Sequence, residues 1–155
     1  MQRIKCEIRE AGHDDRSLLV LLAEETLHPL AAGAGHPEKY HTGDVVSLLD
    51  RAEVFVAQCD GEAGGFVAVE TADDECAVRC ICVNPAFEAR GVANQLLDWV
   101  EGLAIERRLA RLVAFVPESD GPSLHLYRAH GFIGRVDEGD LLALEKRLPE
   151  QGRST

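Results

Sequence analysis

A short segment in the middle of the chain constrains the fold more than any other. Residues 76–83 read Cys-Ala-Val-Arg-Cys-Ile-Cys-Val, which is apolar at every position except Arg79. A strand with one face in solvent alternates apolar and polar residues, whereas a short run that is apolar on both faces is typical of a strand covered on both sides. The run stops at Asn84-Pro85, and proline cannot continue a central ladder. We therefore predict a central, fully covered strand.

The segments before this strand read as one strand, two helices and a hairpin. Apolar spacing, capping residues and turn residues predict a strand at 3–9 with Ile4, Cys6 and Ile8 on one side, a helix from Asp14 or Asp15 to Glu25, an irregular surface loop at 28–41, a short helix at 42–50, and strands at 54–58 and 65–70.

The segments after it alternate helix and strand before a final pair of strands. They are a helix over 90–108, a strand at 112–116, a short helix over 123–130 ended by Gly131, and strands at 132–135 and 141–147. The meander in the middle excludes an open flavodoxin-like nucleotide domain, in which strands and helices alternate throughout. The order predicts an α/β protein with a mixed sheet, as one domain over 1–149 and a short tail at 150–155.

Composition agrees with a single globular domain. The chain has 155 residues, of which 46% are hydrophobic and 28% are charged. Its 16 basic and 27 acidic side chains give a net charge of −11, which excludes most nucleic-acid-binding proteins. The start lacks the apolar core of a secretory signal, and no early apolar run is long enough to span a membrane. Five cysteines, an odd number, favour a reducing cytoplasm.

Three of the cysteines crowd into the central strand. In a regular strand Cys76, Cys80 and Cys82 would project from one face, too nearly collinear to close a tetrahedral zinc site, and the chain has no CxxC pair. We expect small buried thiols there and no metal.

The junction after the central strand carries the first chemical signal. It leads from Val83 through Asn84-Pro85 into a helix whose first turn contains Gly91 and Ala93. Small residues let a ligand approach the backbone, and the free N–H groups of a first helical turn attract anions such as phosphate. Taken alone, a tight turn packed with small residues explains the pattern equally well.

A second signal lies downstream. The spacings of Asp120, Ser123 and Tyr127 place them on one face of a short helix. A tyrosine in such a helix is by itself compatible with an ordinary core residue.

Together, the two segments resemble a known family. Ile81-Cys82-Val83-Asn84-Pro85 followed by Glu88-Ala89-Arg90-Gly91-Val92-Ala93 is similar to the acyl-CoA-binding motif of the GNAT acetyltransferase superfamily, and Leu126-Tyr127-Arg128-Ala129-His130-Gly131-Phe132 is similar to its second signature. The order of elements from Arg3 to Arg147 also agrees. The resemblance implies a central mixed sheet of about seven strands flanked by about four helices, with acetyl-CoA as acyl donor.

The resemblance also implies roles for particular residues. Pantetheine would pair with the backbone of Ile81 and Val83, and a bulge would free an amide near Ile81 or Cys82. The pyrophosphate would lie on the amides of residues 89–93, and Tyr127 would protonate the departing thiolate. The implied cofactor-binding set is Ile81, Cys82, Val83, Glu88, Ala89, Arg90, Gly91, Val92, Ala93, Asp120, Ser123 and Tyr127. Glu88 and Asp120 depart from the family pattern, which has Arg or Gln at the first position and commonly Asn at the second. Arg90 is one candidate to compensate for Glu88.

The catalytic base and the acceptor are less determined. Glu75 is our candidate base, with Glu70 as an alternative, and either is compatible with a solvated hairpin carboxylate. We predict N-acetylation of a small-molecule or peptide amine. A catalytically silent acyl-CoA-binding module stays open, as does a homodimer. Residues 1–77 carry 6 basic and 16 acidic side chains and residues 78–155 carry 10 and 11, so an acidic half would face a cationic acceptor.

Overall fold

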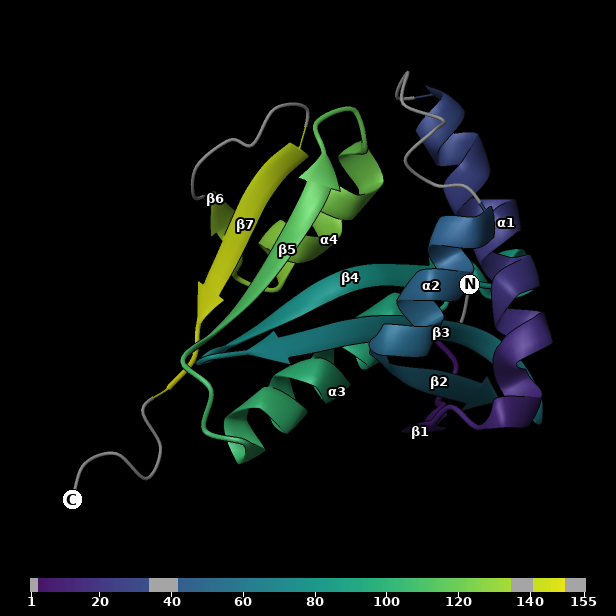
Figure 1. Cartoon of the computed structure of the whole chain (residues 1–155), viewed down its shortest axis with the longest axis horizontal. Helices are drawn as coiled ribbons and strands as arrows, with labels where there is room; N and C mark the ends of the chain where they lie inside the picture. Colours follow the sequence, from purple (N-terminus) through teal and green to yellow (C-terminus); the bar gives the residue numbers. More distant parts are fainter. Residues whose placement is uncertain (1–2, 34–41, 135–140, 150–155) are drawn as a thin grey trace.

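The seven strands of the described chain form one mixed sheet (Figure 1). The computed structural model describes residues 3–33, 42–134 and 141–149. The sheet order is β1-β2-β3-β4-β5-β7-β6, and every neighbouring pair is antiparallel except β4 and β5. The strands are β1 (Glu7–Glu10), β2 (Glu53–Cys59), β3 (Glu62–Ala72), β4 (Glu75–Val83), β5 (Arg111–Pro117), β6 (Ile133–Gly134) and β7 (Leu141–Arg147).

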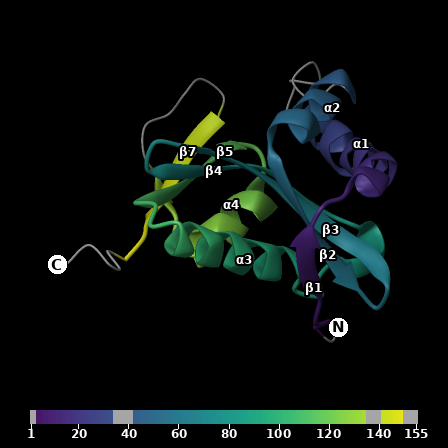
Figure 2. The ribbon, with the colours of Figure 1, turned by 60° about the horizontal axis from the view of Figure 1, so that its bottom comes forward.

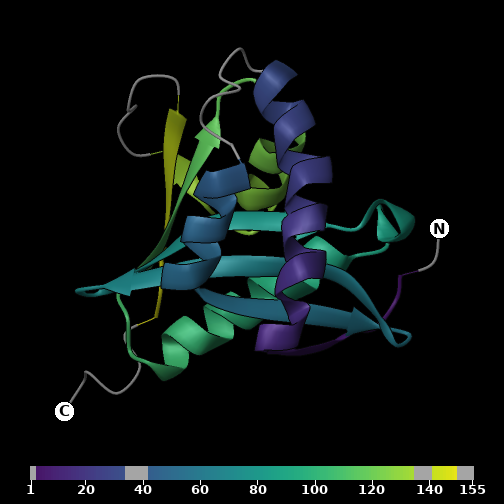
Figure 3. The same cartoon turned by 45° about the vertical axis from the view of Figure 1, so that its right-hand side comes forward.

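Helices cover both faces of this sheet, as the apolar pattern of the central strand predicts. Within the described residues the α-helices are α1 (Arg16–Gly33), α2 (Thr42–Arg51), α3 (Val92–Glu106) and α4 (Gly121–Ala129). Figure 3 shows α1 and α2 in front of β2, β3 and β4, with α3 behind them, and Figure 2 shows α3 and α4 together beneath the sheet. The core is divided accordingly, with Val67 and Leu96 in the cluster on the α3 side and Phe66 and Leu19 in the cluster on the α1 side.

The sheet divides between β4 and β5. These strands pair in parallel only from Glu75↔Arg111 to Val78↔Ala114, although β4 continues to Val83 and β5 continues to Pro117. Figure 1 shows β5 and β7 leaving β4 at a steep angle beyond this point. From residue 79 onward, none of the described strands pairs with the β4 edge that faces β5.

A bulge in β4 lies at the same place. The β3–β4 register passes from Val69↔Val78 to Ala68↔Cys80, so Arg79 is the additional residue. The bulge was expected near Ile81 or Cys82, and that position is wrong. The extra residue also reverses the alternation of side chains, which corrects the prediction that the three cysteines of β4 share a face. Cys76 lies in the core on the α3 side, whereas Cys80 and Cys82 lie in the core on the α1 side.

Two element boundaries differ from the prediction at the N-terminal end. The loop predicted at 28–41 is wrong for residues 28–33, because α1 continues through Pro29 to Gly33; residues 34–41 lie outside the described residues. A proline disfavours a helix interior but does not decide the boundary alone. The strand predicted at 3–9 begins only at Glu7, since the main-chain N–H groups of Ile4 and Cys6 donate to Arg90 and Gln95, around the start of α3.

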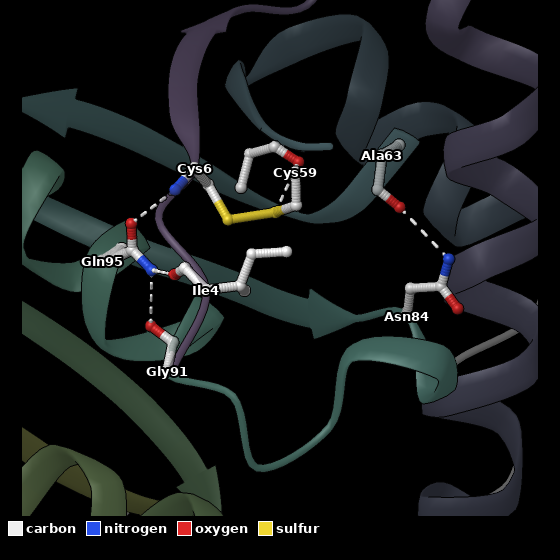
Figure 4. The surroundings of a disulfide bond; sticks show 8 residues. Ile4, Cys6, Cys59, Ala63, Asn84, Gly91 and Gln95 are labelled. Carbon is white, nitrogen blue, oxygen red and sulfur yellow. Dashed lines mark hydrogen bonds between the residues drawn. A yellow bond between two sulfur atoms is a disulfide. The ribbon is translucent and has the colours of Figure 1, made fainter. Parts of the chain in front are cut away.

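A disulfide joins the two strands at this edge of the sheet. Cys6 and Cys59 are bonded, with Cα atoms 4.5 Å apart (Figure 4). Cys59 is the last residue of β2 and is fully buried, and Cys6 directly precedes β1. The sequence alone did not indicate this bond, because it depends on which strands become neighbours. No helix in the described ranges combines the length and the apolar character that a membrane crossing requires.

Candidate functional site: the cleft between β4 and β5

The divergence of β4 and β5 opens a cavity of about 660 Å³. Its walls come from the second half of β4, the end of β5, the start of α3 and one face of α4. The lining includes Ile81, Val83, Ala93, Pro117 and Tyr127. Segments that lie far apart in the sequence therefore meet where the sheet separates.

The turn after β4 is anchored to β3 by Asn84. Its backbone N–H donates to the Gly64 carbonyl at 2.8 Å, and its side-chain Nδ2 donates to the Ala63 carbonyl at 3.1 Å (Figure 4). The Oδ1 atom accepts a hydrogen bond from the Ala86 N–H at 3.0 Å. This side chain thus fixes the direction in which the chain leaves the β4 edge.

The loop that starts α3 has the backbone geometry of an anion-binding turn. Gly91 caps α3 in the left-handed region with φ of 85°, and Ala89 has φ of 60°. Left-handed residues aim successive N–H groups into a concavity, and the first turn of a helix has N–H groups without intrahelical partners. Ala89, Ala93 and Asn94 line the cavity at this end.

The acidic residue of this loop lies outside the cavity. Glu88 is exposed, does not line the cleft, and donates its N–H to the Pro85 carbonyl at 3.3 Å. Arg90, the candidate to compensate for it, lies with its guanidinium 5.8 Å from the centre of the Phe87 ring and also does not line the cleft.

The opposite wall is formed by α4. Asp120 caps this helix, because its Oδ1 accepts a hydrogen bond from the Ser123 N–H at 3.1 Å. Asp120 is buried and lines the cavity together with Ser123 and Tyr127. The three residues predicted to share one helix face therefore do lie on one wall.

Tyr127 is the buried phenol of the site. The residue is 6% exposed, its ring packs edge-on against Phe132 with ring centres 5.1 Å apart, and its hydroxyl has no hydrogen-bond partner among the described residues. Burial raises the pKa of Tyr127 above the ordinary value for tyrosine, and the nearby Cys80 and Asp120 contribute further. The hydroxyl is therefore protonated at neutral pH.

The predicted cofactor set divides into two groups. Residues that line the cavity are Ile81, Val83, Ala89, Ala93, Asp120, Ser123 and Tyr127. The side chains of Cys82 and Val92 are directed into the two cores, Gly91 shapes the turn, and Glu88 and Arg90 lie outside the cavity. Arg3 and Arg79 also line the cleft, although neither was among the predicted site residues. The local pattern holds no signal for Arg3, because its place depends on a long-range contact.

The structure does not bring Glu75 to Tyr127. Glu75 opens β4 at the closed end of the cleft, where its Oε1 accepts a hydrogen bond from Arg111 Nε at 3.0 Å. It does not line the cavity. Glu70 lies nearer the opening, where its Oε1 accepts a hydrogen bond from Arg79 Nε at 2.8 Å. No cluster of potential metal ligands occurs among the residues that the structure describes.

The family assignment follows from comparison with known proteins. Residues 11–132 match the model of the acetyltransferase (GNAT) family. The chain belongs to this family. Its mixed sheet, divided between β4 and β5, is the GNAT fold.

Solved structures agree over nearly the whole chain. The PaiA N-acetyltransferase from Thermoplasma acidophilum, solved in complex with coenzyme A, is 18% identical with a TM-score of 0.79, over 93% of this chain and 99% of that chain. The ribosomal-protein-S18-alanine N-acetyltransferase from Escherichia coli is 17% identical with a TM-score of 0.78, over 97% of this chain and 98% of that chain. Ard1 from Thermoplasma volcanium is 18% identical with a TM-score of 0.77, over 95% of this chain and 100% of that chain. At these identities the likeness shows the fold.

Proposed function

We propose that this protein transfers the acetyl group of acetyl-CoA directly to the amine of a small molecule or peptide. The observation that carries the proposal is the presence of a free β4 edge and a buried, protonated tyrosine on the walls of one cavity. Family membership supports the reaction class, and the cleft supports the assignment of the chemistry to particular residues.

The chain fits an extended, phosphate-bearing donor in three respects. The β4 edge from residue 79 to Val83 has no partner among the described strands on the β5 side, so it can pair with the amide groups of a pantetheine arm. The turn at Ala89 and Gly91 directs backbone N–H groups toward the place where phosphates would lie. The bulge at Arg79 leaves a main-chain group outside the β3–β4 ladder, close to where the thioester would lie.

Tyr127 supplies the proton for the leaving group. Transfer of the acetyl group to a neutral amine forms the amide C–N bond, breaks the C–S bond and releases a thiolate. The Tyr127 hydroxyl donates its proton to that thiolate, and bulk solvent, reached through the open cavity, restores it. The acceptor nitrogen loses two protons, the ammonium proton before attack and one N–H proton as the amide forms, and water in the open cavity carries both to bulk solvent. The sequence-based assignment of Glu75 to this step has no support from its position.

The cysteine in the cleft does not carry the acetyl group in this proposal. Cys80 lines the cavity, but a hydrogen bond with the Cys82 thiol and burial raise its pKa well above the ordinary cysteine value. The thiolate is the nucleophilic form of cysteine, so this environment disfavours a covalent acyl-cysteine intermediate. Direct transfer within one ternary complex needs no such group.

The acceptor is proposed to be cationic. The 10 excess negative charges are carried by residues 1–77, which form β1 to β3 as well as α1 and α2. A negative field raises the encounter rate and affinity for cations and is screened by salt. Acceptor affinity that does not fall with rising salt would contradict this part of the proposal.

The test is an amine-library screen followed by one substitution. Coenzyme A release is measured with acetyl-CoA and small-molecule and peptidyl amines, and the best acceptor is then used to compare wild type with Tyr127→Phe. Phenylalanine keeps the ring contact with Phe132 and removes only the hydroxyl. We expect kcat to fall about 10²-fold or more, which is the usual contribution of a positioned acid, with little change in the Kd of CoA. Unchanged kcat would remove Tyr127 from this role, and no release with any amine would favour a silent CoA-binding module.

A further inference from the structure

The N-terminal segment brings an arginine to the edge of the cleft. Arg3 lines the cavity although it is 88 residues before Gly91 in the chain. Its aliphatic carbons pass directly over that glycine, since a Cβ atom built on Gly91 would lie 3.5 Å from Arg3 Cγ and 3.6 Å from Cδ. The Arg3 side chain therefore runs along the turn that starts α3.

We propose that Arg3 is a phosphate-binding residue for the acyl donor. This inference rests on the proposed function and adds a residue that comes from outside the donor-binding motif. Glu88 is acidic and supplies no cationic contact to a phosphate, and the Arg90 guanidinium lies over the Phe87 ring, outside the cavity. The inference assigns this contact to Arg3.

Three hydrogen bonds fix the segment that carries Arg3. The Ile4 N–H donates to the Arg90 carbonyl at 3.0 Å, so the residue after Arg3 is bonded to the residue before Gly91. On α3, the Gln95 side chain donates a hydrogen bond from Nε2 to the Ile4 carbonyl at 2.6 Å, and its Oε1 accepts one from the Cys6 N–H at 2.9 Å (Figure 4).

The disulfide attaches the same segment from its other side. Cys6 is bonded to Cys59 at the buried end of β2, so residues 4–6 are held both to α3 and to the sheet. An arginine on an anchored backbone loses less conformational freedom on binding an anion than one in a free terminus would lose.

The charges around the cavity leave Arg3 available for an anion. Arg79 also lines the cleft, but it is paired with Glu70 at 2.8 Å. Asp120 is buried and bonded to the first turn of α4. Arg3 is exposed and has no hydrogen bond or ion pair with any residue in the described part of the chain. Guanidinium groups bind phosphate oxygens through two parallel hydrogen bonds, which suits a donor with several phosphates.

The experiment compares ligands that differ in their phosphates. Isothermal titration calorimetry gives the Kd of CoA, of dephospho-CoA and of pantetheine for wild type, Arg3→Gln and Arg3→Lys. Lys5→Gln is the matched control, because it removes one positive charge from the same segment at an exposed residue that does not line the cavity. We expect Arg3→Gln to weaken CoA binding about tenfold, the order expected for one charge-assisted contact. Arg3→Lys should recover part of this loss, and Lys5→Gln should change the Kd less than twofold.

The pattern across ligands separates the possible outcomes. If Arg3 contacts the pyrophosphate, dephospho-CoA loses as much affinity as CoA does; if it contacts the 3′-phosphate, the loss is confined to CoA. Pantetheine, which has neither group, should not distinguish the variants, and the dependence of CoA affinity on salt should become weaker in Arg3→Gln. Equal Kd values for CoA in wild type and Arg3→Gln would overturn the inference, as would equal losses for all three ligands. Failure of wild type to bind CoA would instead overturn the proposed function itself.

Discussion

Replacement of Gln95 with methionine isolates the contact between the N-terminal segment and α3. The Gln95 amide bonds to three main-chain groups, the Cys6 N–H, the Ile4 carbonyl and the Gly91 carbonyl. Methionine has nearly the same length and fits the same space, but it has no strong donor or acceptor. Gln95→Met therefore removes the hydrogen bonds with little change in packing.

The expected loss of stability follows from counting the groups left without a partner. The Gly91 carbonyl still accepts a hydrogen bond from the backbone N–H of residue 95 at 3.2 Å, so the loss of the side-chain hydrogen bond at this carbonyl costs little free energy. The Cys6 N–H and the Ile4 carbonyl lose the bonds described above in a partly buried place. At about 1 to 1.5 kcal/mol for each, the free energy of unfolding should fall by about 2 to 3 kcal/mol. For a domain of this length, that corresponds to a decrease in Tm of about 5 to 10 °C.

Urea unfolding under non-reducing conditions measures this loss. The midpoint should decrease with an unchanged m-value. Gln58→Met is the matched control, because among the described residues the Gln58 side-chain amide bonds only to the exposed side chain of Arg9. The same Gln95→Met protein should bind CoA more weakly, since the segment that carries Arg3 is then held less firmly. A free energy of unfolding within 0.5 kcal/mol of wild type, on the order of experimental error, would refute the reasoning.

Three further predictions concern other parts of the molecule. Glu75→Gln should leave kcat within about twofold of wild type, measured by CoA release, because its carboxylate is bonded to Arg111 outside the cavity; a large loss would restore it as the catalytic base. Gly64→Ala should destabilise the protein by about 1 to 3 kcal/mol in thermal unfolding, since the new Cβ would collide with Cys59 Sγ. The loss should be smaller in a Cys59→Ala background, and equal losses in the two backgrounds would contradict the collision. A hydrogen bond from the Arg9 guanidinium lowers the pKa of Asp15 to about 2. This carboxylate therefore stabilises the fold above about pH 4 and loses that effect as pH falls toward 2. Asp15→Asn should flatten the dependence of the free energy of unfolding on pH in this window, and an unchanged slope would contradict the prediction.

Much of the fold was predictable because its signals are local. The apolar run at 76–83 predicted a strand covered on both faces, and β4 has helices on both sides. The strands predicted at 54–58 and 65–70 form the hairpin of β2 and β3, and its turn residues Asp60 and Gly61 both have positive φ. The two motif segments also predicted residues that line one cavity, including Val83 and Tyr127.

The parts that were wrong or missed depend on contacts between distant segments. The bulge at Arg79 is a property of the β3–β4 register, and one extra residue reverses the face on which Cys80 and Cys82 lie. The disulfide between Cys6 and Cys59 exists because β1 pairs with β2, which the alternation of residues in either strand alone does not specify.

Hydrogen exchange with and without acetyl-CoA tests the central claim most directly, since the claim is that the donor occupies the free edge of β4. Residues 79–83 lie on the β4 edge that faces the cleft, and residues 89–94 form the turn into α3 and its first residues. The amides of both ranges should exchange more slowly when acetyl-CoA is bound. Amides of the first two turns of α1, which begins at Arg16, should exchange at the same rate in both states, because this helix does not line the cleft. Slower exchange at 79–83 and 89–94 is the result that the account predicts. Binding of acetyl-CoA without protection of the β4 edge would contradict it.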